Sequence, residues 1–433
     1  MQGELNKLDG YSRRKFMSYS AKSLLGVGVA PMLGNTIASD ARAEQLAAHS
    51  PRARNVIYLY MTGGMSHIDT FDTKPGKATQ GPVESIKTAV TGQRISEYLP
   101  GMAGQMDKVA VLNGMYSTQG AHETGQYFMH TSYLKRGTIS HPSLATWAMK
   151  LGGRLNTTLP GSVVVNGGSG SIGHGFMESR FGPLGIGNPE RGLQHSKLAK
   201  GVSEARLRRR LDMANTLNDK FLREHSTRKV RDYNTLYDEA LRMMHSSDLG
   251  AFDISQETAG LRAAYGDNSF GQGCLLARRL VEHRVRFVEV HLGGWDTHND
   301  NFERVQERAT LLDQGMSTLL SDLDRRGMLE ETLVVLSTEF GRSPNIVQTS
   351  GGRNHHPKAF SCLLAGGGVH GGINHGSTDP TGHEVATGKV TVPDFNATIA
   401  HALGLPIDHV ETSPSGRPFK IADKGRPVFE LFS

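Results

Sequence analysis

Short apolar runs rich in β-branched residues alternate with longer segments of helical periodicity, and this alternation constrains the fold more than any other feature. A short run that stops at glycine or at a polar loop is typical of a buried strand. Helices between the strands supply the crossovers that a parallel sheet requires. We therefore predict an α/β fold with a mainly parallel central sheet and helices on both faces. The predicted strands cover 56–60, 109–112, 163–165, 285–290, 332–336 and 360–364, and the clearest helices cover 123–135, 270–284, 302–326 and 394–403.

Residues 203–246 interrupt the alternation with a longer helical pattern. Leu207 and Leu211 keep helical spacing in the first half, and Tyr233 and Tyr237 keep it in the second. No strand-type run separates the two halves. We predict that this segment is a helical hairpin packed on, or inserted into, the α/β body.

The N-terminal residues have the three parts of an export signal in the expected order. Arg13 and Arg14 precede a mildly apolar stretch over 24–37, and Ala41–Ala43 is a small-x-small cleavage pattern. The arginine pair is typical of substrates of the twin-arginine translocase, which we expect to be a partner during export. Polar and charged residues interrupt the apolar stretch, so we expect no stable membrane span. The prediction is a signal peptide over 1–43 and a periplasmic or secreted protein over 44–433.

The charge balance of the remaining chain argues against a nucleic-acid partner. Residues 1–43 hold six Lys or Arg and three Asp or Glu, so residues 44–433 hold 42 basic and 39 acidic side chains. Such a balance gives no reason to propose nucleic acid as a partner. The two cysteines, Cys274 and Cys362, each lie in an apolar Cys-Leu-Leu-Ala run and are expected to be buried thiols rather than a disulfide.

Residues able to bind metals or protons follow the predicted strands. In open α/β sheets, ligands bind at the carboxyl ends of the strands, so these loops are expected to meet at one edge. Taken singly, an Asp or His in a glycine loop is more often a turn residue or a helix cap than a ligand. Their coincidence at successive strand ends predicts a polar site. The residues are His67, Asp69, His122, Asp296, His298, Glu339, Arg342, His355 and His356.

The chemistry of these side chains suits a divalent metal ion, either Zn, Mn or Ca. Zinc accepts imidazole together with carboxylate, as Asp296-x-His298 and the pair His355-His356 offer. Glu339 is a further candidate, because a carboxylate that leaves a buried strand needs a cation, a donor or water. Arg342 is suited either to hold an anionic substrate or to pair with a carboxylate of the protein.

Four motifs, in the order in which they occur along the chain, resemble those of domain-of-unknown-function family 1501. That family is sulfatase-like and is placed in the alkaline phosphatase superfamily. The resemblance covers nearly all of the chain after residue 43. It implies a central sheet with metals at its carboxyl edge. The motifs are Ser66–Pro75, Gly293–His298, Thr338–Pro344 and His355–Val369.

The resemblance also implies roles for individual residues. In that superfamily, the loop after a central strand gives an Asp and a His to one metal, and Asp296 and His298 match this role. A later strand end gives an acidic ligand, which Glu339 matches. A late histidine completes the set, which His355 or His356 matches.

The sequence departs from the superfamily pattern in two places. The first strand of the superfamily usually ends in a metal-binding Asp, whereas Gly63-Gly64 stands there, so Asp69 or His67 is expected to substitute. No residue matches the nucleophile securely. Thr124 lies in the corresponding loop as a candidate nucleophile, and His122 in the same loop is a candidate ligand or general acid.

These features favour an exported metal-dependent hydrolase of phosphate or sulfate esters, in which Arg342 helps to hold the anion. Neither cysteine lies in Cys-x-Pro-x-Arg, so a formylglycine sulfatase is not expected. The missing nucleophile and Gly63-Gly64 also permit an alternative, a non-catalytic binding protein for an anionic polysaccharide or an envelope partner. A structural envelope component without any site is a third, weaker interpretation.

Overall fold

The computed structural model describes most of the chain after residue 51. The predicted signal peptide over 1–43 lies outside the described residues, as does much of the first half of the predicted hairpin. In the second half, Arg228–Met244 forms helix α7, which confirms the helical prediction there. The described residues are 52–167, 172–194, 203, 205–207, 209–214, 216, 228–244 and 246–432.

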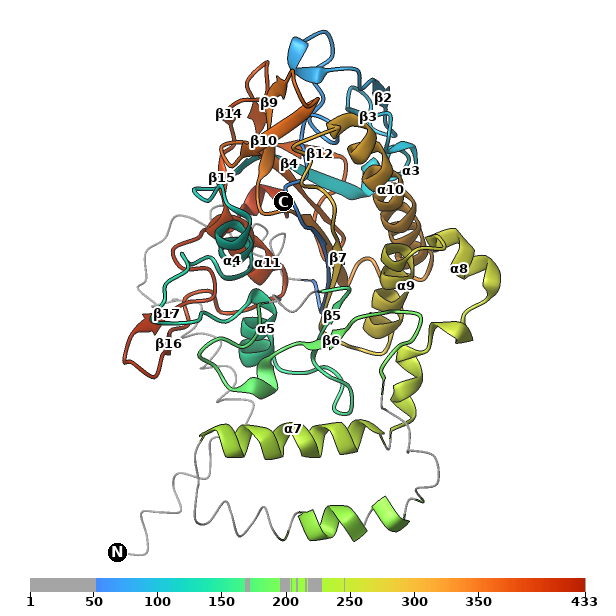
Figure 1. The fold of residues 1–433 in the computed structure, drawn as a ribbon, viewed down its shortest axis with the longest axis vertical. Helices are drawn as coiled ribbons and strands as arrows, with labels where there is room; N and C mark the ends of the chain where they lie inside the picture. The colour runs from blue at the N-terminus through green and yellow to red at the C-terminus, as the bar shows by residue number, and fades with distance from the viewer. Residues whose placement is uncertain are drawn as a thin grey trace, which may run out of the picture. The chain divides into compact units, whose positions relative to one another are not determined.

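The described strands form a mainly parallel central sheet, as the sequence predicts. Its order is β12-β4-β11-β8-β1-β7-β5-β6, with β15 paired to β4 (Figure 1). Strand β1 lies in the middle, parallel to both β7 and β8. The strands are β1 Asn55–Met61, β4 Val109–Tyr116, β5 Ser162–Val165, β6 Leu184–Ile186, β7 Phe287–Leu292, β8 Thr332–Ser337, β11 Phe360–Ala365, β12 Ile373–His375 and β15 Val390–Thr391.

Strand β11 is antiparallel to both of its neighbours, β4 and β8. The reason lies in the connection before it. The chain leaves β8 and forms the hairpin of β9 (Gly341–Val347) and β10 (Gly352–His356) beyond the same sheet edge. A parallel return requires a crossover to the opposite edge, and none intervenes. The hairpin therefore stays at the carboxyl edge of β8.

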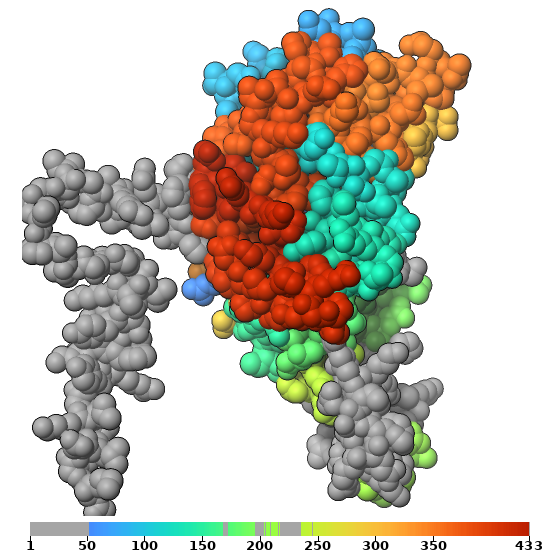
Figure 2. Space-filling model, turned by 90° about the vertical axis from the view of Figure 1, so that its left-hand side faces the viewer, coloured from blue at the N-terminus to red at the C-terminus, as the bar shows by residue number. Residues whose placement is uncertain are grey.

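Alternate residues of β1 enter two different cores, as the strand period of two requires. Ile57, Leu59 and Met61 pack with α9 (Ser269–Glu282) and α10 (Asn301–Arg325) on one face. Val56, Tyr58 and Tyr60 pack on the other face with α4 (His122–Thr131), α5 (Leu144–Gly152) and α11 (Val392–Ala402) (Figure 1). Helices on both faces confirm the predicted class. Figure 2 shows the red C-terminal segment against the teal segment that contains α4, in agreement with the contacts between α4 and α11.

Two predicted boundaries are wrong for identifiable reasons. Strand β4 continues past Asn113-Gly114 because Gly114 is a packing position rather than a turn. A Cβ on Gly114 would lie 2.1 Å from the carbonyl oxygen of Gly388. Helix α4 ends at Thr131, before the predicted 135, because Ser132 adopts a left-handed conformation with φ 64°.

Shorter elements complete the described part of the chain. None of the helices in these ranges combines the length and apolar character that a bilayer crossing needs. The remaining helices are α3 Pro100–Ala103 and α8 Ala259–Tyr265, with 3₁₀ turns at Ala78–Gln80, Met106–Lys108, Ser179–Phe181, Ser247–Phe252, Ile254–Gln256 and Phe429–Leu431. The remaining strands are β2 Ser85–Lys87, β3 Arg94–Ser96, β13 Ser377–Thr378, β14 Val385–Thr387, β16 Glu411–Thr412 and β17 Pro418–Phe419.

A buried ion pair fixes the β9–β10 hairpin to the loop after β1. Arg353 of β10 donates from Nε and Nη2 to the two carboxylate oxygens of Asp69, at 2.8 and 2.9 Å. Both side chains are fully buried. Ser66 Oγ and Asn301 Nδ2 donate to the same carboxylate at 2.6 and 2.9 Å. Hydrogen bonds therefore satisfy a pair of charges that burial would otherwise make unfavourable.

We expect Asp69→Asn to lower the free energy of unfolding by about 3–5 kcal/mol, because it leaves the Arg353 charge buried without its counterion. Urea unfolding of the purified protein measures this change. The matched control is Glu384→Gln, which breaks the exposed pair with Lys358 and should change the same free energy by less than about 1 kcal/mol. Equal effects of the two substitutions would contradict the role given to the buried pair.

Candidate metal centre

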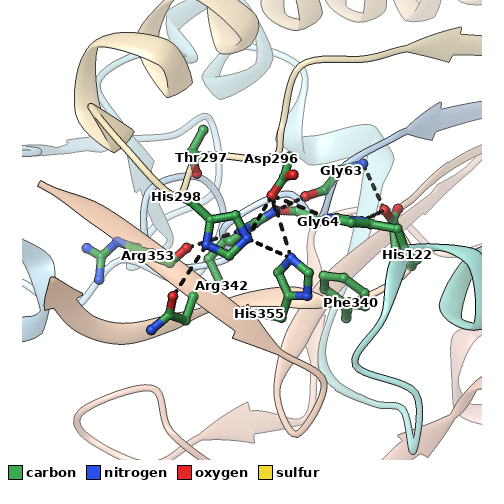
Figure 3. Close-up of polar contacts among 12 residues, drawn as sticks. Gly63, Gly64, His122, Asp296, Thr297, His298, Phe340, Arg342, Arg353 and His355 are labelled. Atoms are coloured by element: carbon green, nitrogen blue, oxygen red, sulfur yellow. Dashed lines mark hydrogen bonds and ion pairs between the residues drawn. The ribbon is translucent and has the colours of Figure 1, made fainter. Parts of the chain in front are cut away.

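Four histidine and carboxylate side chains meet at the carboxyl edge of the sheet, and they come from three separate segments. Asp296 and His298 lie in the loop after β7, His122 begins α4, and His355 lies on β10 (Figure 3). His122, Asp296 and His355 place one ligand atom each within 4.8 Å of one another. The structure thus brings together four of the residues that the sequence places at successive strand ends.

Glu339 determines which nitrogen of His122 faces the centre. The Glu339 side chain is fully buried, and its Oε1 accepts hydrogen bonds from Gly63 N and from His122 Nδ1, both at 2.8 Å. Its Oε2 accepts from the Tyr60 hydroxyl at 2.9 Å. His122 Nδ1 must carry the proton, because a carboxylate only accepts. His122 Nε2 is thus directed at Asp296 Oδ1, 3.4 Å away.

His122 is prepared to bind either a proton or a cation at Nε2. The hydrogen bond and charge of Glu339 raise the pKa of His122, although burial opposes the shift. His122 Nε2 is buried and has no hydrogen-bond partner among the described residues. A carboxylate behind a histidine is the usual support of a metal-binding imidazole. In this arrangement Glu339 contacts His122 rather than the centre itself.

His355 and His298 direct their Nε2 atoms toward each other. His355 Nδ1 donates to the carbonyl of Gly120 at 2.8 Å, and burial lowers the pKa of His355, so its Nε2 carries a lone pair. His298 Nδ1 contacts Asn354 Oδ1 at 3.3 Å. The two Nε2 atoms are 2.9 Å apart. Such a contact is favourable when one of the two nitrogens carries a proton or when a cation lies between them.

Asp296 is the common neighbour of these histidines. Its Oδ1 lies 3.2 Å from His298 Nε2 and 3.6 Å from His355 Nε2. Burial opposes ionisation, but the hydrogen bond and charge of Arg342, together with the two nearby histidines His122 and His298, lower the pKa of Asp296 to about 2. The side chain is 47 % exposed. It is therefore an ionised carboxylate that solvent or a ligand reaches.

Arg342 positions this carboxylate from a fully buried place on β9. Its Nη2 donates to Asp296 Oδ1 at 2.5 Å and also to the Gly63 carbonyl. Nε donates to the Gly64 carbonyl at 3.0 Å, and Nη1 donates to the Arg353 carbonyl at 3.1 Å. Of the two roles that the sequence left open, the structure shows the pairing with a carboxylate. The guanidinium is committed to the protein itself.

The donor set fits a divalent ion that accepts nitrogen ligands. Three imidazoles and one carboxylate are typical of Zn²⁺, whereas Ca²⁺ takes six to eight oxygen ligands. Each imidazole has its other nitrogen held, by Glu339, by the Gly120 carbonyl or by Asn354. Such second hydrogen bonds orient metal-binding histidines in known sites. The residues that could hold the ion are His122, Asp296, His298 and His355.

Two of the predicted histidines lie elsewhere. His356 follows His355 on β10, so its side chain points to the opposite face. Its Nε2 donates to the His383 carbonyl at 2.6 Å, and its ring stacks on His67 at 6.4 Å. His67 is fully buried, donates to the Gly382 carbonyl at 2.9 Å and has a pKa lowered to about 3 by burial. The structure does not bring this pair to the centre.

Asp69 and Thr124 are also engaged away from the centre. Asp69 was expected to replace the missing carboxylate of the first strand, but it is the buried partner of Arg353. Thr124 Oγ1 donates to the Ala121 carbonyl of its own helix start, at 3.3 Å. No contact within the described residues joins either side chain to Asp296. The roles predicted for them stay predictions.

A second group of possible ligands was not predicted from the sequence. His130 of α4 and Glu289 and His291 of β7 lie together inside the face that contains Tyr60. His130 falls within the predicted helix 123–135 and Glu289 within the predicted strand 285–290, and neither is among the candidate ligands named from the sequence. The available signal was Glu289-x-His291, two polar residues on one side of a buried run.

The fold and the edge cluster define an α/β protein with a candidate metal centre at the carboxyl ends of its strands. The chain belongs to the family described as "Protein of unknown function (DUF1501)", whose profile matches residues 53–432. This confirms the resemblance seen in the motifs. No curated protein sequence matches the chain.

Several solved structures are similar in chain course at low identity. The lipoteichoic acid synthase LtaP from Listeria monocytogenes is 8 % identical, with 84 % of this chain and 78 % of that chain covered and a TM-score of 0.39. The PsFucS1 sulfatase from Pseudoalteromonas sp. is 13 % identical, with coverages of 92 % and 76 % and a TM-score of 0.40. A protein in the alkaline phosphatase superfamily from Vibrio parahaemolyticus is 9 % identical, with coverages of 88 % and 70 % and a TM-score of 0.37.

Gly63→Ala should destabilise the protein and weaken metal binding together. The φ of Gly63 is +120°, and a Cβ would lie 2.5 Å from Asp296 N, so the Asp296 loop must move. We expect the free energy of unfolding to fall by roughly 1–3 kcal/mol from the backbone strain alone. Urea unfolding and a metal titration measure the two effects. The control is Gly293→Ala, in the loop after β7 that contains Asp296. Its Cβ would meet no atom within 4 Å, so the free energy of unfolding should change by less than about 0.5 kcal/mol.

Proposed function

We propose that this protein is a metal-dependent hydrolase of phosphate or sulfate esters, with one divalent ion held by His122, Asp296, His298 and His355. One observation carries the proposal: imidazole nitrogens whose partner nitrogens are already bonded converge on an exposed, ionised carboxylate. Without a cation or protons, this arrangement places lone pairs against one another. The family resemblance supports the same class of chemistry.

The residues of the centre have separable tasks in this proposal. A bound Zn²⁺ would polarise the ester oxygen and lower the pKa of a coordinated water. Arg342 holds Asp296 in place, and Glu339 keeps the proton of His122 on Nδ1. Thr124 is the candidate nucleophile only if its hydroxyl leaves the Ala121 carbonyl. Hydrolysis breaks the bond between the bridging oxygen and phosphorus or sulfur, and water supplies both the new oxygen and the proton of the leaving alcohol.

We also propose that the protein acts outside the cytoplasm, in the periplasm or after secretion. The twin-arginine pattern at Arg13 and Arg14 and the cleavage pattern at Ala41–Ala43 support export through the twin-arginine translocase. This route carries proteins that fold before they cross the membrane. A metal centre assembled from three separate chain segments suits such a route, because its ligands meet only in the folded state.

A second candidate function is binding of an anionic polysaccharide or an envelope partner without turnover. One observation favours it. The two residues predicted to attack the ester and to hold its anion, Thr124 and Arg342, are both engaged with the protein itself. Tight binding of a sulfated or phosphorylated glycan to the metal-loaded protein, with no ester hydrolysis, would favour this function over the first.

Single substitutions of the adjacent residues His355 and His356 test whether only His355 is a metal ligand. We expect His355→Ala to weaken metal binding by at least about tenfold, because it removes a donor from the centre. His356→Ala is the matched control and should keep the metal. The measurement is elemental mass spectrometry on protein purified without chelators, followed by hydrolysis of p-nitrophenyl phosphate and p-nitrophenyl sulfate. Equal metal content in wild type and His355→Ala would remove the basis of the proposal.

A further inference from the structure

The buried cluster of His130, Glu289 and His291 lies on the α4 face of the sheet, beneath the carboxyl end of β7. Glu289 and His291 are two residues apart on β7, and in the parallel register with β1 they stand beside Tyr58 and Tyr60. His130 reaches them from α4. The three residues are only 6, 6 and 9 % exposed, for His130, Glu289 and His291 respectively. They occupy a site that is nearly closed to solvent.

A carboxylate in this position requires a positive partner, because burying an isolated charge is strongly unfavourable. Both histidines direct Nε2 at one and the same oxygen, Glu289 Oε1. The distances are 2.9 Å from His130 and 2.5 Å from His291. Tyr60 packs its ring against both histidines, at 4.6 and 5.3 Å, but its hydroxyl is bonded to Glu339. Among the described contacts, the histidines are therefore the only side chains that meet Oε1.

The proton on His130 is located by its second hydrogen bond. His130 Nδ1 contacts the Gln126 carbonyl at 2.8 Å, and a carbonyl only accepts, so Nδ1 carries a proton. In the neutral ring, Nε2 then presents a lone pair to the carboxylate. Two occupants make this contact favourable: a second proton or a metal ion. Glu289 raises the pKa of His130 against the effect of burial, so the proton is a real competitor.

We propose that this cluster is a second metal site, which takes Zn²⁺ or a similar divalent ion through His130 Nε2, Glu289 Oε1 and His291 Nε2. Two imidazoles and one carboxylate form a recurrent ligand set for such ions. Tetrahedral Zn²⁺ with ligand distances near 2.0–2.1 Å separates its ligand atoms by roughly 3.3 Å. The present separations of 2.9 and 2.5 Å differ from this value by less than an ångström. The third separation, between the two Nε2 atoms, is no more than 4.8 Å, so side-chain rotations would be needed to admit the ion, without any rearrangement of the strands.

The site would be structural rather than catalytic, because it is buried and sits behind the centre at the sheet edge. It would bond the C-terminal half of α4 to β7. The N-terminal residue of the same helix is His122, which the proposed function needs beside Asp296 and Glu339. A metal at His130 would thus hold α4 in the orientation that presents His122. This inference does not depend on hydrolytic activity and is tested by metal content and stability.

The experiment uses the full exported protein, purified without chelators, and counts metal by elemental mass spectrometry. Wild type should hold about two equivalents, Glu289→Gln about one and Asp296→Asn about one. The double variant should hold none. The chelator-treated wild type should regain thermal stability on addition of Zn²⁺, and Glu289→Gln should regain less. Glu289→Gln keeps the shape of the side chain, so circular dichroism should show an unchanged fold.

The outcomes separate this inference from the proposed function. In one outcome, Glu289→Gln retains all the metal of wild type and only Asp296→Asn loses metal. The buried cluster is then a protonated ion pair and the inference is overturned, whereas the proposed centre at the sheet edge stands. If metal disappears with Glu289→Gln alone, the buried site stands and the edge centre loses its ion. If Glu289→Gln fails to fold, a second experiment tests the buried site: Co²⁺ is titrated into Asp296→Asn from which metal has been removed with a chelator. The absence of d–d absorption bands in that titration overturns the inference.

Discussion

The arrangement of the loops at the carboxyl edge of the sheet depends on the hydrogen bonds of one buried group, the guanidinium of Arg342. It lies on β9 and is bonded to the carbonyls of Gly63, Gly64 and Arg353 and to the carboxylate of Asp296. Burying this charge costs several kcal/mol unless such partners surround it. The end of β1, the β9–β10 hairpin and the loop after β7 are held around it for that reason. The side chains that these segments carry then face one another.

Helix α4 is joined to the sheet by two histidine–glutamate pairs, His122 with Glu339 and His130 with Glu289. The histidines are separated by just over two helical turns and so lie on the same side of α4. Both glutamates are buried: Glu339 lies in the loop just after β8, and Glu289 lies on β7. Each histidine has one nitrogen fixed by a protein acceptor and the other directed to a carboxylate. The two pairs differ in which nitrogen meets the glutamate: Glu339 binds His122 Nδ1, whereas Glu289 meets His130 Nε2.

Much of the fold and part of the site could be predicted from the sequence, for physical reasons. Apolar, β-branched runs identify strands wherever burial is complete, and Asp296, His298 and His355 follow or adjoin such runs. The antiparallel β11 could not be predicted, because nothing local encodes the hairpin before it. Asp69 and His356 were expected at the centre, but a distant arginine and the alternation of side chains along β10 direct them elsewhere.

Gly63, in the loop after β1, explains why this loop contributes no side chain to the proposed centre. Gly63 contributes backbone groups instead of a side-chain ligand: its N–H binds Glu339 and its carbonyl binds Arg342. A side chain there would collide with Asp296 N, so a carboxylate at this position is incompatible with the observed loop. The side chains of the proposed centre come instead from α4, the β7 loop and β10. In the proposed function these side chains would hold the ion, and Asp296, being exposed, is the residue beside which a substrate anion or water could approach.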